Sequence, residues 1–264
     1  MTTGKEFEGK WALVTGASSG IGAAFARELS ARVAKLILTA RRVERMEHLA
    51  TELRAQGTEV RVVAADLTDP AAPGEIFSAT VGAGLTVEIL INNAGLGQYG
   101  SFTESPEEQE LAQVRVNCEA VVRLARLFVP PMVERRAGFV LVVASTASFQ
   151  PVPYLTTYAA TKVFDRFFAE GLRAEVARFG VKVTALCPGP TESEFWTVSR
   201  ASAFKGRSVQ TAEAVAQKAV VGLLAGRRTV VPSLDGKLMD WLGRFVPAGL
   251  VACTVEKIAR PRER

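Results

Sequence analysis

The chain is poor in histidine and cysteine. Its 264 residues include a single histidine, His48, and three cysteines, Cys118, Cys187 and Cys253. The cysteines have no metal-ligand spacing, and an odd number of them argues against a disulfide framework. His48 lies among charged residues of a predicted helix, where a solvated face is its expected place. We therefore expect no metal site, and we expect the cysteines to be buried or partly buried small residues.

A long apolar run is also missing near the amino terminus. Residues 2–10 are polar and charged, which argues against a signal peptide and predicts a cytoplasmic protein. The formal net charge is +5, but the basic residues are spread over several predicted helices and no nucleic-acid-binding motif accompanies them. The sequence has no internal repeat and no low-complexity segment. We expect no nucleic-acid partner.

Apolar strands alternate with helical segments along most of the chain. Hydrophobic residues make up 48% of it, enough for a large core, and no linker divides it. Strands are predicted at residues 11–15, 35–40, 60–67, 87–92, 139–145, 182–187 and 229–231. This order predicts an α/β protein with a doubly wound, seven-stranded parallel sheet, helices on both faces and a single domain over residues 1–264.

One helix start can be read in detail. The segment S-P-E-E at residues 105–108 has a serine suited to capping, a proline at the first helical position and a glutamate three residues after the serine. The pattern predicts a long helix that is capped by Ser105, carries Asn117 and ends near Pro130.

A glycine-rich turn follows the first predicted strand. Residues 15–22 read T-G-A-S-S-G-I-G and lead into a helical segment, which is the order that a dinucleotide-binding turn requires. Gly16 allows the tight turn, while Gly20 and Gly22 let the backbone approach a pyrophosphate. Free amide groups at the helix start favour a negative charge. A glycine turn without a ligand is the alternative interpretation, and a second motif argues against it.

Ser145, Tyr158 and Lys162 form that second motif, S-x12-Y-x3-K. Apolar residues after Tyr158 recur at helical spacing, so Tyr158 and Lys162 should lie one turn apart on one helix face. An ammonium beside a phenol favours the phenolate, and should lower the pKa of Tyr158 from about 10. Ser145 ends a predicted buried strand, where its hydroxyl can face the ligand crevice and polarise a carbonyl. The motif indicates an oxidoreductase.

The chain resembles the short-chain dehydrogenase/reductase family from about residue 10 to about residue 232. The family's G-x3-G-x-G turn is found at residues 16–22, its N-N-A-G stretch at residues 92–95 and its P-G element at residues 188–189. The resemblance implies a Rossmann fold. It also implies a catalytic tetrad, with a water held by the asparagine in a proton relay through the lysine: Asn117, Ser145, Tyr158 and Lys162.

The chain departs from the family pattern in two places. Val33 stands where a glycine usually ends the first helix. A β-branched residue there should be strained by roughly 1 kcal/mol or more, unless the helix end is built differently. The tail beyond Pro232 is longer than in the compact reductases of fatty-acid synthesis, which argues against an acyl-carrier substrate.

The end of the second predicted strand indicates which cofactor binds. An acidic residue there would bind the ribose hydroxyls of NAD, but this chain has Ala40 followed by Arg41 and Arg42. A guanidinium can bind a phosphate bidentately, so NADP(H) is preferred and NAD(H) is the alternative. Arg41 matches the family's discriminating position.

The resemblance extends the cofactor site to other loops. Asp66 and Leu67 should flank the adenine, and Thr191 should contact the nicotinamide carboxamide. The predicted cofactor-binding residues are Gly16, Ser18, Ser19, Gly20, Ile21, Gly22, Arg41, Arg42, Asp66, Leu67, Asn93, Ala94, Gly95, Tyr158, Lys162, Pro188, Gly189 and Thr191.

The substrate pocket should be largely apolar. The loops expected around it supply five candidate residues: Phe149, Pro153, Tyr154, Phe195 and Trp196. They favour a hydrophobic carbonyl compound. The resulting hypothesis is an NADP-dependent oxidoreductase that reduces a ketone or aldehyde by hydride transfer, with Tyr158 as general acid/base and Ser145 supporting the alkoxide. The alternatives are a 3-oxoacyl thioester reductase and a non-catalytic NADP-binding regulator, against which the intact tetrad argues.

Residues 235–264 are expected to be a helical extension of the same domain. They combine apolar residues such as Trp241 and Leu250 with basic ones such as Lys257 and Arg260, a composition suited to a membrane surface or a partner groove. The apolar stretch is shorter than the about 20 residues that span a bilayer. A helix that covers the substrate cleft or a subunit interface is the interpretation we favour. By resemblance, the chain should form a homodimer or homotetramer through helices around residues 106–129 and 155–179.

Overall fold

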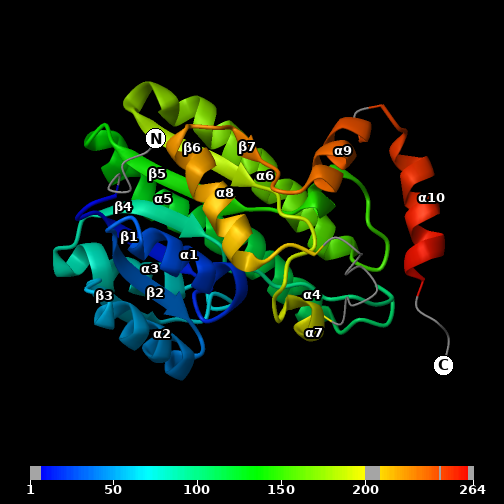
Figure 1. The fold of residues 1–264 in the computed structure, drawn as a ribbon. Coiled ribbons are helices and arrows are strands. Elements are labelled where there is room, and N and C mark those ends of the chain that lie inside the picture. Colours follow the sequence, from blue (N-terminus) through cyan, green and yellow to red (C-terminus); the bar gives the residue numbers. More distant parts are fainter. Residues whose placement is uncertain (1–6, 200–208, 244, 261–264) are drawn as a thin grey trace.

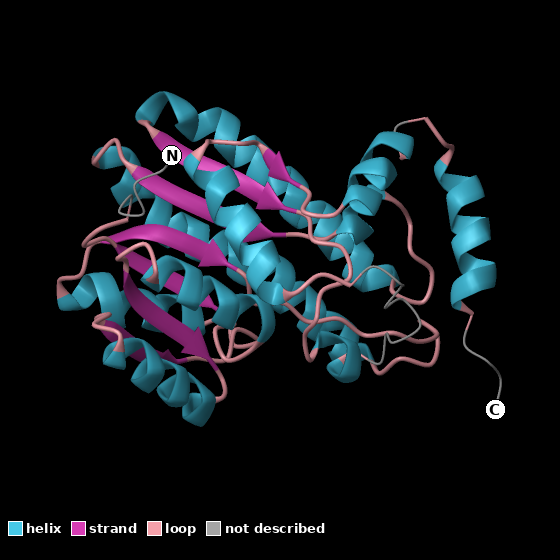
Figure 2. Ribbon diagram, viewed as in Figure 1, coloured by secondary structure: helices cyan, strands magenta, loops and turns pink. Residues whose placement is uncertain are grey.

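The computed structural model describes residues 7–199, 209–243 and 245–260, and its centre is a twisted parallel sheet (Figure 2). The strands are β1 (Trp11–Thr15), β2 (Lys35–Ala40), β3 (Val60–Ala64), β4 (Val87–Asn92), β5 (Gly138–Val143), β6 (Val181–Leu186) and β7 (Thr229–Val230). They form one seven-stranded sheet in the order β3-β2-β1-β4-β5-β6-β7. The predicted fold class is confirmed.

Helices cover both faces of the sheet (Figure 1). One face packs against α1 (Gly20–Ser30), α2 (Val43–Ala55) and α8 (Ala212–Leu224). The other packs against α3 (Ala72–Thr80), α5 (Ala120–Glu134) and α6 (Thr156–Val176). Strand β1 serves both layers, because Ala12 and Val14 point to the first and Trp11 and Leu13 to the second. Burial on both faces explains why the strands are almost continuously apolar.

The strand order reverses between β1 and β4. Chain connections after β1 run to β2 and β3 on one side, whereas β4 lies on the other side of β1. Loops leaving the carboxyl ends of β1 and β4 therefore separate, and a crevice opens between them. The glycine turn follows β1, and the N-N-A-G stretch begins at Asn92, the last residue of β4. Both motifs therefore meet at this crevice.

Strand β3 ends at Ala64, so the prediction that it continues to Leu67 is wrong. Its neighbour β2 stops at Ala40, and only one further backbone hydrogen bond, from Ala65 to Ala40, follows the ladder. Asp66 then starts a turn, in which its carboxylate accepts hydrogen bonds from the amide and hydroxyl of Thr68. The turn exposes Asp66 at the crevice.

The long helix around Asn117 is built differently from its prediction. Pro106 occupies the cap position of α4 (Glu107–Val114), while the hydroxyl of Ser105 is buried and has no hydrogen-bond partner in the described part of the chain. A π-helical turn (Arg115–Glu119) joins α4 to α5, which continues through Pro130 to Glu134. The apolar face of α5 runs on beyond the prolines to the buried Met132, and this burial outweighs the backbone hydrogen bonds that the prolines cannot make.

Val33 has a positive φ of 65°, as the departure from glycine predicted. The residue follows the end of α1, and its carbonyl accepts a hydrogen bond of 3.1 Å from the amide of Gly9. Its side chain is 45% exposed, so little packing compensates the left-handed backbone. The strain is therefore local to the end of α1.

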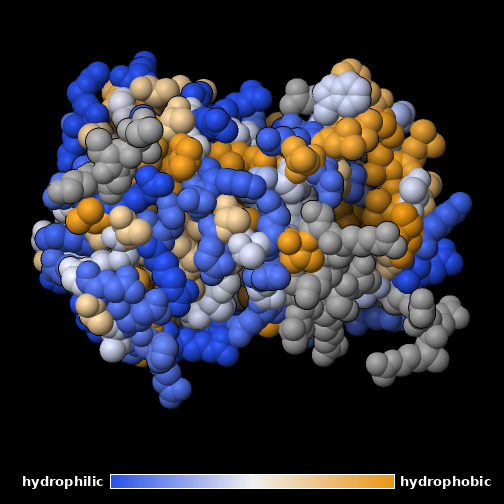
Figure 3. Space-filling model, in the orientation of Figure 1, coloured by the Kyte–Doolittle hydropathy of each residue, from blue (hydrophilic) through white to orange (hydrophobic). Residues whose placement is uncertain are grey.

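The carboxyl-terminal region contains α9 (Leu234–Leu242) and α10 (Ala248–Ala259), and α10 stands at the edge of the molecule (Figure 1). Apolar side chains gather on the surface of these two helices (Figure 3). They include Leu234, Leu238, Trp241, Leu250 and Ile258, each more than half exposed, and Phe245 between the two helices is exposed as well. Within the described residues, no helix has both the length and the apolar character needed to cross a membrane.

Candidate active site

The glycine turn brings backbone against backbone. Gly16 and Gly20 have φ values of 66° and 54°, which favour glycine. A Cβ atom on Gly22 would lie 2.2 Å from the carbonyl oxygen of Gly16, so no side chain fits there. Ser19 precedes α1 without a side-chain cap hydrogen bond, which leaves amide donors at the helix start. This cradle fits the pyrophosphate of a dinucleotide.

The N-N-A-G stretch is tied to the glycine turn through Thr15. The hydroxyl of Thr15 accepts hydrogen bonds of 2.9 Å from the amides of Asn93 and Ala94. The side chain of Asn93 donates to the carbonyl oxygen of Thr15 at 2.8 Å. Asn93 and Ala94 thus hold two crevice loops at a fixed spacing, and their predicted place at the cofactor site has a structural reason.

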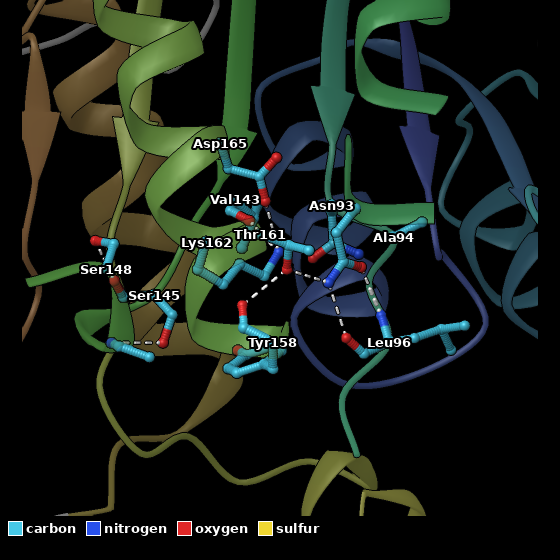
Figure 4. A network of polar contacts seen from close by, with 12 residues as sticks. Asn93, Ala94, Leu96, Val143, Ser145, Ser148, Tyr158, Thr161, Lys162 and Asp165 are labelled. Carbon is cyan, nitrogen blue, oxygen red and sulfur yellow. Dashed lines mark hydrogen bonds and ion pairs between the residues drawn. The ribbon is translucent and has the colours of Figure 1, made fainter. Parts of the chain in front are cut away.

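Tyr158 and Lys162 lie one turn apart on α6, next to the carboxyl end of β5 (Figure 4). The ammonium of Lys162 is 5.9 Å from the centre of the Tyr158 ring. It donates hydrogen bonds to the carbonyl oxygen of Val143 at 2.8 Å and to the carboxylate of Asp165 at 2.9 Å. Lys162 and Asp165 are both buried. Lys162 of the motif thus forms a buried ion pair with Asp165, a residue outside the motif.

The pKa of Tyr158 is raised from its usual value, opposite to our expectation. Burial of the phenol is the largest cause, because a phenolate is poorly solvated there. Lys162 and a hydrogen bond with Ser145 lower the pKa, but Asp165 raises it. Asp165 offsets part of the charge that was expected to favour the phenolate. At neutral pH the phenol of Tyr158 is therefore protonated.

Ser145 follows β5 and begins a short 3-10 turn (Thr146–Phe149). Its hydroxyl accepts a hydrogen bond of 3.1 Å from the amide of Ala147, which fixes its direction. Its backbone carbonyl accepts another from the hydroxyl of Ser148 at 2.6 Å. The 3-10 turn therefore holds Ser145 beside Tyr158 at the crevice.

Asn117 lies in the π-helical turn and is fully buried. Its side-chain oxygen accepts a hydrogen bond from the amide of Leu96 at 2.8 Å, and its side-chain nitrogen donates to the carbonyl oxygen of Leu96 at 2.9 Å and to the hydroxyl of Thr161 at 2.8 Å. The amide group of Asn117 therefore joins the N-N-A-G loop to α6. Its role in a water relay stays a prediction, and π-helical turns are frequent at functional sites.

Arginines surround the place predicted for the cofactor's ribose. The guanidinium of Arg41 lies 3.9 Å from the carboxylate of Asp66. Arg42 donates to the hydroxyls of Ser18 and Ser19 in the glycine turn, at 3.1 and 2.7 Å. It also donates to the carboxylate of Glu194 at 2.7 Å. Arg42 thus connects the glycine turn to the loop after β6.

Arg45, which the sequence reasoning did not single out, binds the same carboxylate of Glu194 from the first turn of α2. Arg45 and Arg42 together hold the pKa of Glu194 at about 2, so the carboxylate stays ionised. The available signal was spacing, because Arg45 follows Arg42, the residue at the N-cap of α2, by three residues and lies in the first turn of that helix.

One cavity of about 610 Å³ brings these groups together. Its wall contains Ser145, Tyr158, Lys162 and all the other predicted cofactor-binding residues, whereas Asn117 lies behind it. Of the predicted substrate residues, Phe195 contributes to the wall and its ring centre lies 5.1 Å from that of Tyr158. The side chain of Trp196 lies outside the described part of the structure.

Phe149, Pro153 and Tyr154 do not line this cavity. Phe149 packs instead against the guanidinium of Arg166, at 4.8 Å. Tyr154 has a φ of 65°, and its hydroxyl donates to the carboxylate of Glu256 at 3.0 Å. The apolar wall is made by other residues: Val152, Leu155, Val198, Met239, Val255 and Ile258.

The last two described helices thus form part of the cavity. Met239 belongs to α9, and Val255 and Ile258 belong to α10. The hydroxyl of Tyr99 donates to the carbonyl oxygen of Ala259 at 2.7 Å, which fastens the end of α10 to the loop after β4. The arrangement agrees with the interpretation of the tail as a cover of the cleft. Among the described residues, no cluster of histidine, cysteine or carboxylate side chains could hold a metal ion.

A family model for the short chain dehydrogenase matches residues 10–203. The chain is 31% identical over 252 residues to a very-long-chain 3-oxoacyl-CoA reductase of Anas platyrhynchos, a match that covers 92% of this chain and 78% of that protein. Its match with the reductase of that name from Bos taurus covers 59% of the longer protein, at 34% identity.

Solved structures agree with this match. A short-chain dehydrogenase from Sphingobium yanoikuyae in complex with NADPH has a TM-score of 0.81 and 30% identity, covering 90% of this chain and 97% of that one. A short-chain dehydrogenase/reductase from Burkholderia phymatum in complex with NAD has a TM-score of 0.83 and 25% identity, covering 90% and 93%. With the glycine cradle, the tetrad and the matched family model in agreement, the chain belongs to the short-chain dehydrogenase/reductase family of oxidoreductases, which act on carbonyl or hydroxyl groups.

Proposed function

We propose that this protein uses NADPH to reduce the carbonyl group of an apolar ketone or aldehyde. The observation that carries the proposal is the position of Tyr158, a phenol with a raised pKa, on the wall of a cavity whose substrate side is apolar. A proton donor is what carbonyl reduction needs, because the carbonyl oxygen must gain a proton. The apolar wall favours a substrate without charge near the reacting carbon.

The preference for NADP over NAD rests on charge at the ribose end. No carboxylate follows β2 directly, and Arg41, Arg42 and Arg45 lie on this side of the crevice. Guanidinium groups bind phosphate more strongly than they bind ribose hydroxyls. The Sphingobium relative holds NADPH and the Burkholderia relative holds NAD, so the family accommodates both.

The residues have distinct roles in the proposed reduction. The bound nicotinamide supplies the hydride. Tyr158 donates the proton to the carbonyl oxygen, and Ser145, positioned by Ala147, hydrogen-bonds that oxygen as negative charge develops. Lys162 is held by Val143 and lies in the wall of the cavity, one helix turn from Tyr158. Phe195 packs on Tyr158 and helps to exclude water.

A 3-oxoacyl thioester is the second candidate substrate. It is favoured by the name of the Anas platyrhynchos relative, a very-long-chain 3-oxoacyl-CoA reductase. The 3-oxo group of such a thioester is itself a ketone, and an acyl chain suits the wall of Val152, Leu155 and Val255. The same proton and hydride transfers would reduce it.

The expected dimer or tetramer has support from the surface of the long helices. Leu111 and Val114 of α4, Val122 of α5, and Phe164 and Phe167 of α6 are all exposed, Phe167 by 64%. Apolar side chains gathered on neighbouring helices favour a subunit contact. The expected cytoplasmic location stays a prediction.

Absorbance at 340 nm tests the proposed function. The protein is mixed with NADPH or NADH and with apolar ketones, aldehydes or 3-oxoacyl thioesters. We expect oxidation of NADPH with at least one apolar carbonyl, and a loss of about 10²- to 10⁴-fold in the Tyr158→Phe variant. Tyr154→Phe is the matched control. It also removes a tyrosine hydroxyl, but this hydroxyl binds Glu256, and Tyr154 does not line the cavity.

Two results would contradict the proposal. If the Tyr158→Phe variant keeps full activity, Tyr158 is not the proton donor. If NADPH binds tightly but no carbonyl in any of the three classes is reduced, the non-catalytic regulator is the better interpretation.

A further inference from the structure

Asp165 is a buried carboxylate next to the reaction centre. It lies on α6 three residues after Lys162, is 1% exposed and pairs with the ammonium at 2.9 Å. One of its oxygens, Oδ1, has no hydrogen-bond partner in the described structure. Such a group is costly to bury, since burial raises its pKa to about 6 even with Lys162 beside it. A buried ion pair is weak support for stability, so the relevant effect of Asp165 is on the charge beside the neighbouring phenol of Tyr158.

Few other charges face this pair. Tyr158 and Lys162 come from α6 itself, and the π-helical turn contributes Cys118. Burial raises the pKa of the Cys118 thiol to about 11, so it is neutral at ordinary pH. Strand β5 contributes the carbonyl oxygen of Val143, which carries no net charge. The electrostatic balance at Tyr158 therefore depends on the charges of Lys162 and Asp165.

The contacts of Lys162 show how far its positive charge is compensated. Its ammonium has three N–H donors, of which one goes to Val143 and one to Asp165. The third is available toward the cavity, where Lys162 is part of the wall. An unpaired ammonium at this place would favour the phenolate of Tyr158. A paired one has much of its field cancelled by the carboxylate.

We propose that Asp165 is a positioning residue that neutralises Lys162 and keeps Tyr158 in its protonated form, so that the site is set for proton donation and hence for carbonyl reduction. The proposal rests on the function proposed above, in which Tyr158 is the acid. Reduction needs the phenol, whereas oxidation of an alcohol needs the phenolate as base. Asp165 therefore extends the range of pH over which reduction is fast and shifts alcohol oxidation to higher pH.

The direction of the effect follows from the charges. Replacing Asp165 with asparagine leaves the positive charge of Lys162 uncompensated, and this stabilises the phenolate. The pH at which reduction declines on the basic side should then fall by about one unit or more, because an opposite charge within ~4–6 Å shifts a pKa by about 1–3 units. Oxidation of the product alcohol at pH 7 should rise in the same variant. A purely structural role would lower both rates without moving either pH profile.

The experiment compares pH profiles of kcat/KM in both directions for the wild type, Asp165→Asn and Asp165→Glu. The glutamate variant keeps the charge and should retain the basic limb of the wild type. Glu170→Gln is the matched control, since it also removes a carboxylate from α6. The carboxylate of Glu170 pairs with Arg166 and not with Lys162. A downward shift confined to Asp165→Asn supports the proposal, and identical limbs in wild type and Asp165→Asn overturn it.

A direct titration of Tyr158 is independent of turnover and of the folding of the Asp165 variants. The ultraviolet difference between wild type and Tyr158→Phe, followed near 295 nm as pH rises, reports tyrosinate formation at Tyr158. We expect it above pH 10, the usual value for tyrosine. Titration below about pH 8 would overturn the proposal even if Asp165→Asn does not fold. If the titration of Tyr158 moves to lower pH in Asp165→Asn but no carbonyl is reduced, the proposed function fails while the electrostatic role of Asp165 stands.

Discussion

Arg42 and Glu194 should have opposite effects on NADPH binding. Arg42 contacts both serines of the glycine turn, and its guanidinium is also bound by the carboxylate of Glu194. The 2′-phosphate of NADPH requires guanidinium donors of this kind, so the phosphate and Glu194 compete for them. Removing Arg42 should weaken NADPH binding, and removing the charge of Glu194 should strengthen it.

The magnitudes follow from exposure. A hydrogen bond to a charged group contributes about 1.5–3 kcal/mol. Arg42 is 44% exposed, so solvent screening reduces this to about 1–2 kcal/mol, or roughly 5- to 30-fold in Kd for Arg42→Ala. Glu194 forms two half-exposed ion pairs, each worth about 0–1 kcal/mol. Glu194→Gln should therefore lower the Kd for NADPH by about two- to tenfold.

Isothermal titration with NADPH and NADH measures both effects without turnover. Neither substitution should change the Kd for NADH by more than about twofold, because NADH has no 2′-phosphate. Glu192→Gln is the control for Glu194→Gln, since it removes an exposed charge two residues away in the same loop. The double variant Arg42→Ala/Glu194→Gln should bind NADPH less tightly than the sum of the single effects predicts, since Glu194 acts partly through Arg42.

If Glu194→Gln lowers the Kd for NADH as much as the Kd for NADPH, the proposed competition between Glu194 and the 2′-phosphate is refuted. Such a result would mean that the loop of Glu194 obstructs the whole cleft. Unchanged NADPH binding in Arg42→Ala would place the phosphate elsewhere, with Arg41 as the next residue to replace.

Three further predictions concern other parts of the molecule. Val33→Gly should raise the free energy of unfolding by about 0.5 kcal/mol in urea titrations. The relief of about 1–2 kcal/mol of backbone strain exceeds the entropy that glycine adds to the unfolded chain. A lower free energy of unfolding in this variant would mean that the packing of Val33 outweighs its strain. Phe167→Glu should lower the mass measured by light scattering, because it places a charge among the exposed apolar residues of α6, and an unchanged mass would exclude this face from the subunit contact. Removal of residues 248–264 should raise KM for apolar substrates while leaving NADPH binding intact, because Val255 and Ile258 line the cavity. Equal sedimentation of the full-length and truncated proteins with liposomes would exclude a membrane role for this segment.

Much of the fold and part of the site follow from local patterns. Continuous apolar strands buried on both faces, separated by helical segments, require a parallel sheet, and the order of the elements makes it doubly wound. Gly22 must lack a side chain because the turn returns on itself within a few residues. Tyr158 and Lys162 share a helix face because four residues make about one turn. In each of these cases, the relation joins residues that are close in the chain.

Other properties arise only when distant segments pack together. The ion pair of Asp165 with Lys162 has helical spacing, but its burial, which makes it important for Tyr158, comes from the layers around α6. Glu194 meets Arg42 across 152 positions of the chain, and Ile258 reaches the cavity from α10. The sequence by itself determined the sheet, the glycine turn and the tyrosine that we propose as proton donor. Tertiary packing decided which charges are buried together, and hence the protonation of that donor, because desolvation depends on neighbours that local spacing does not specify.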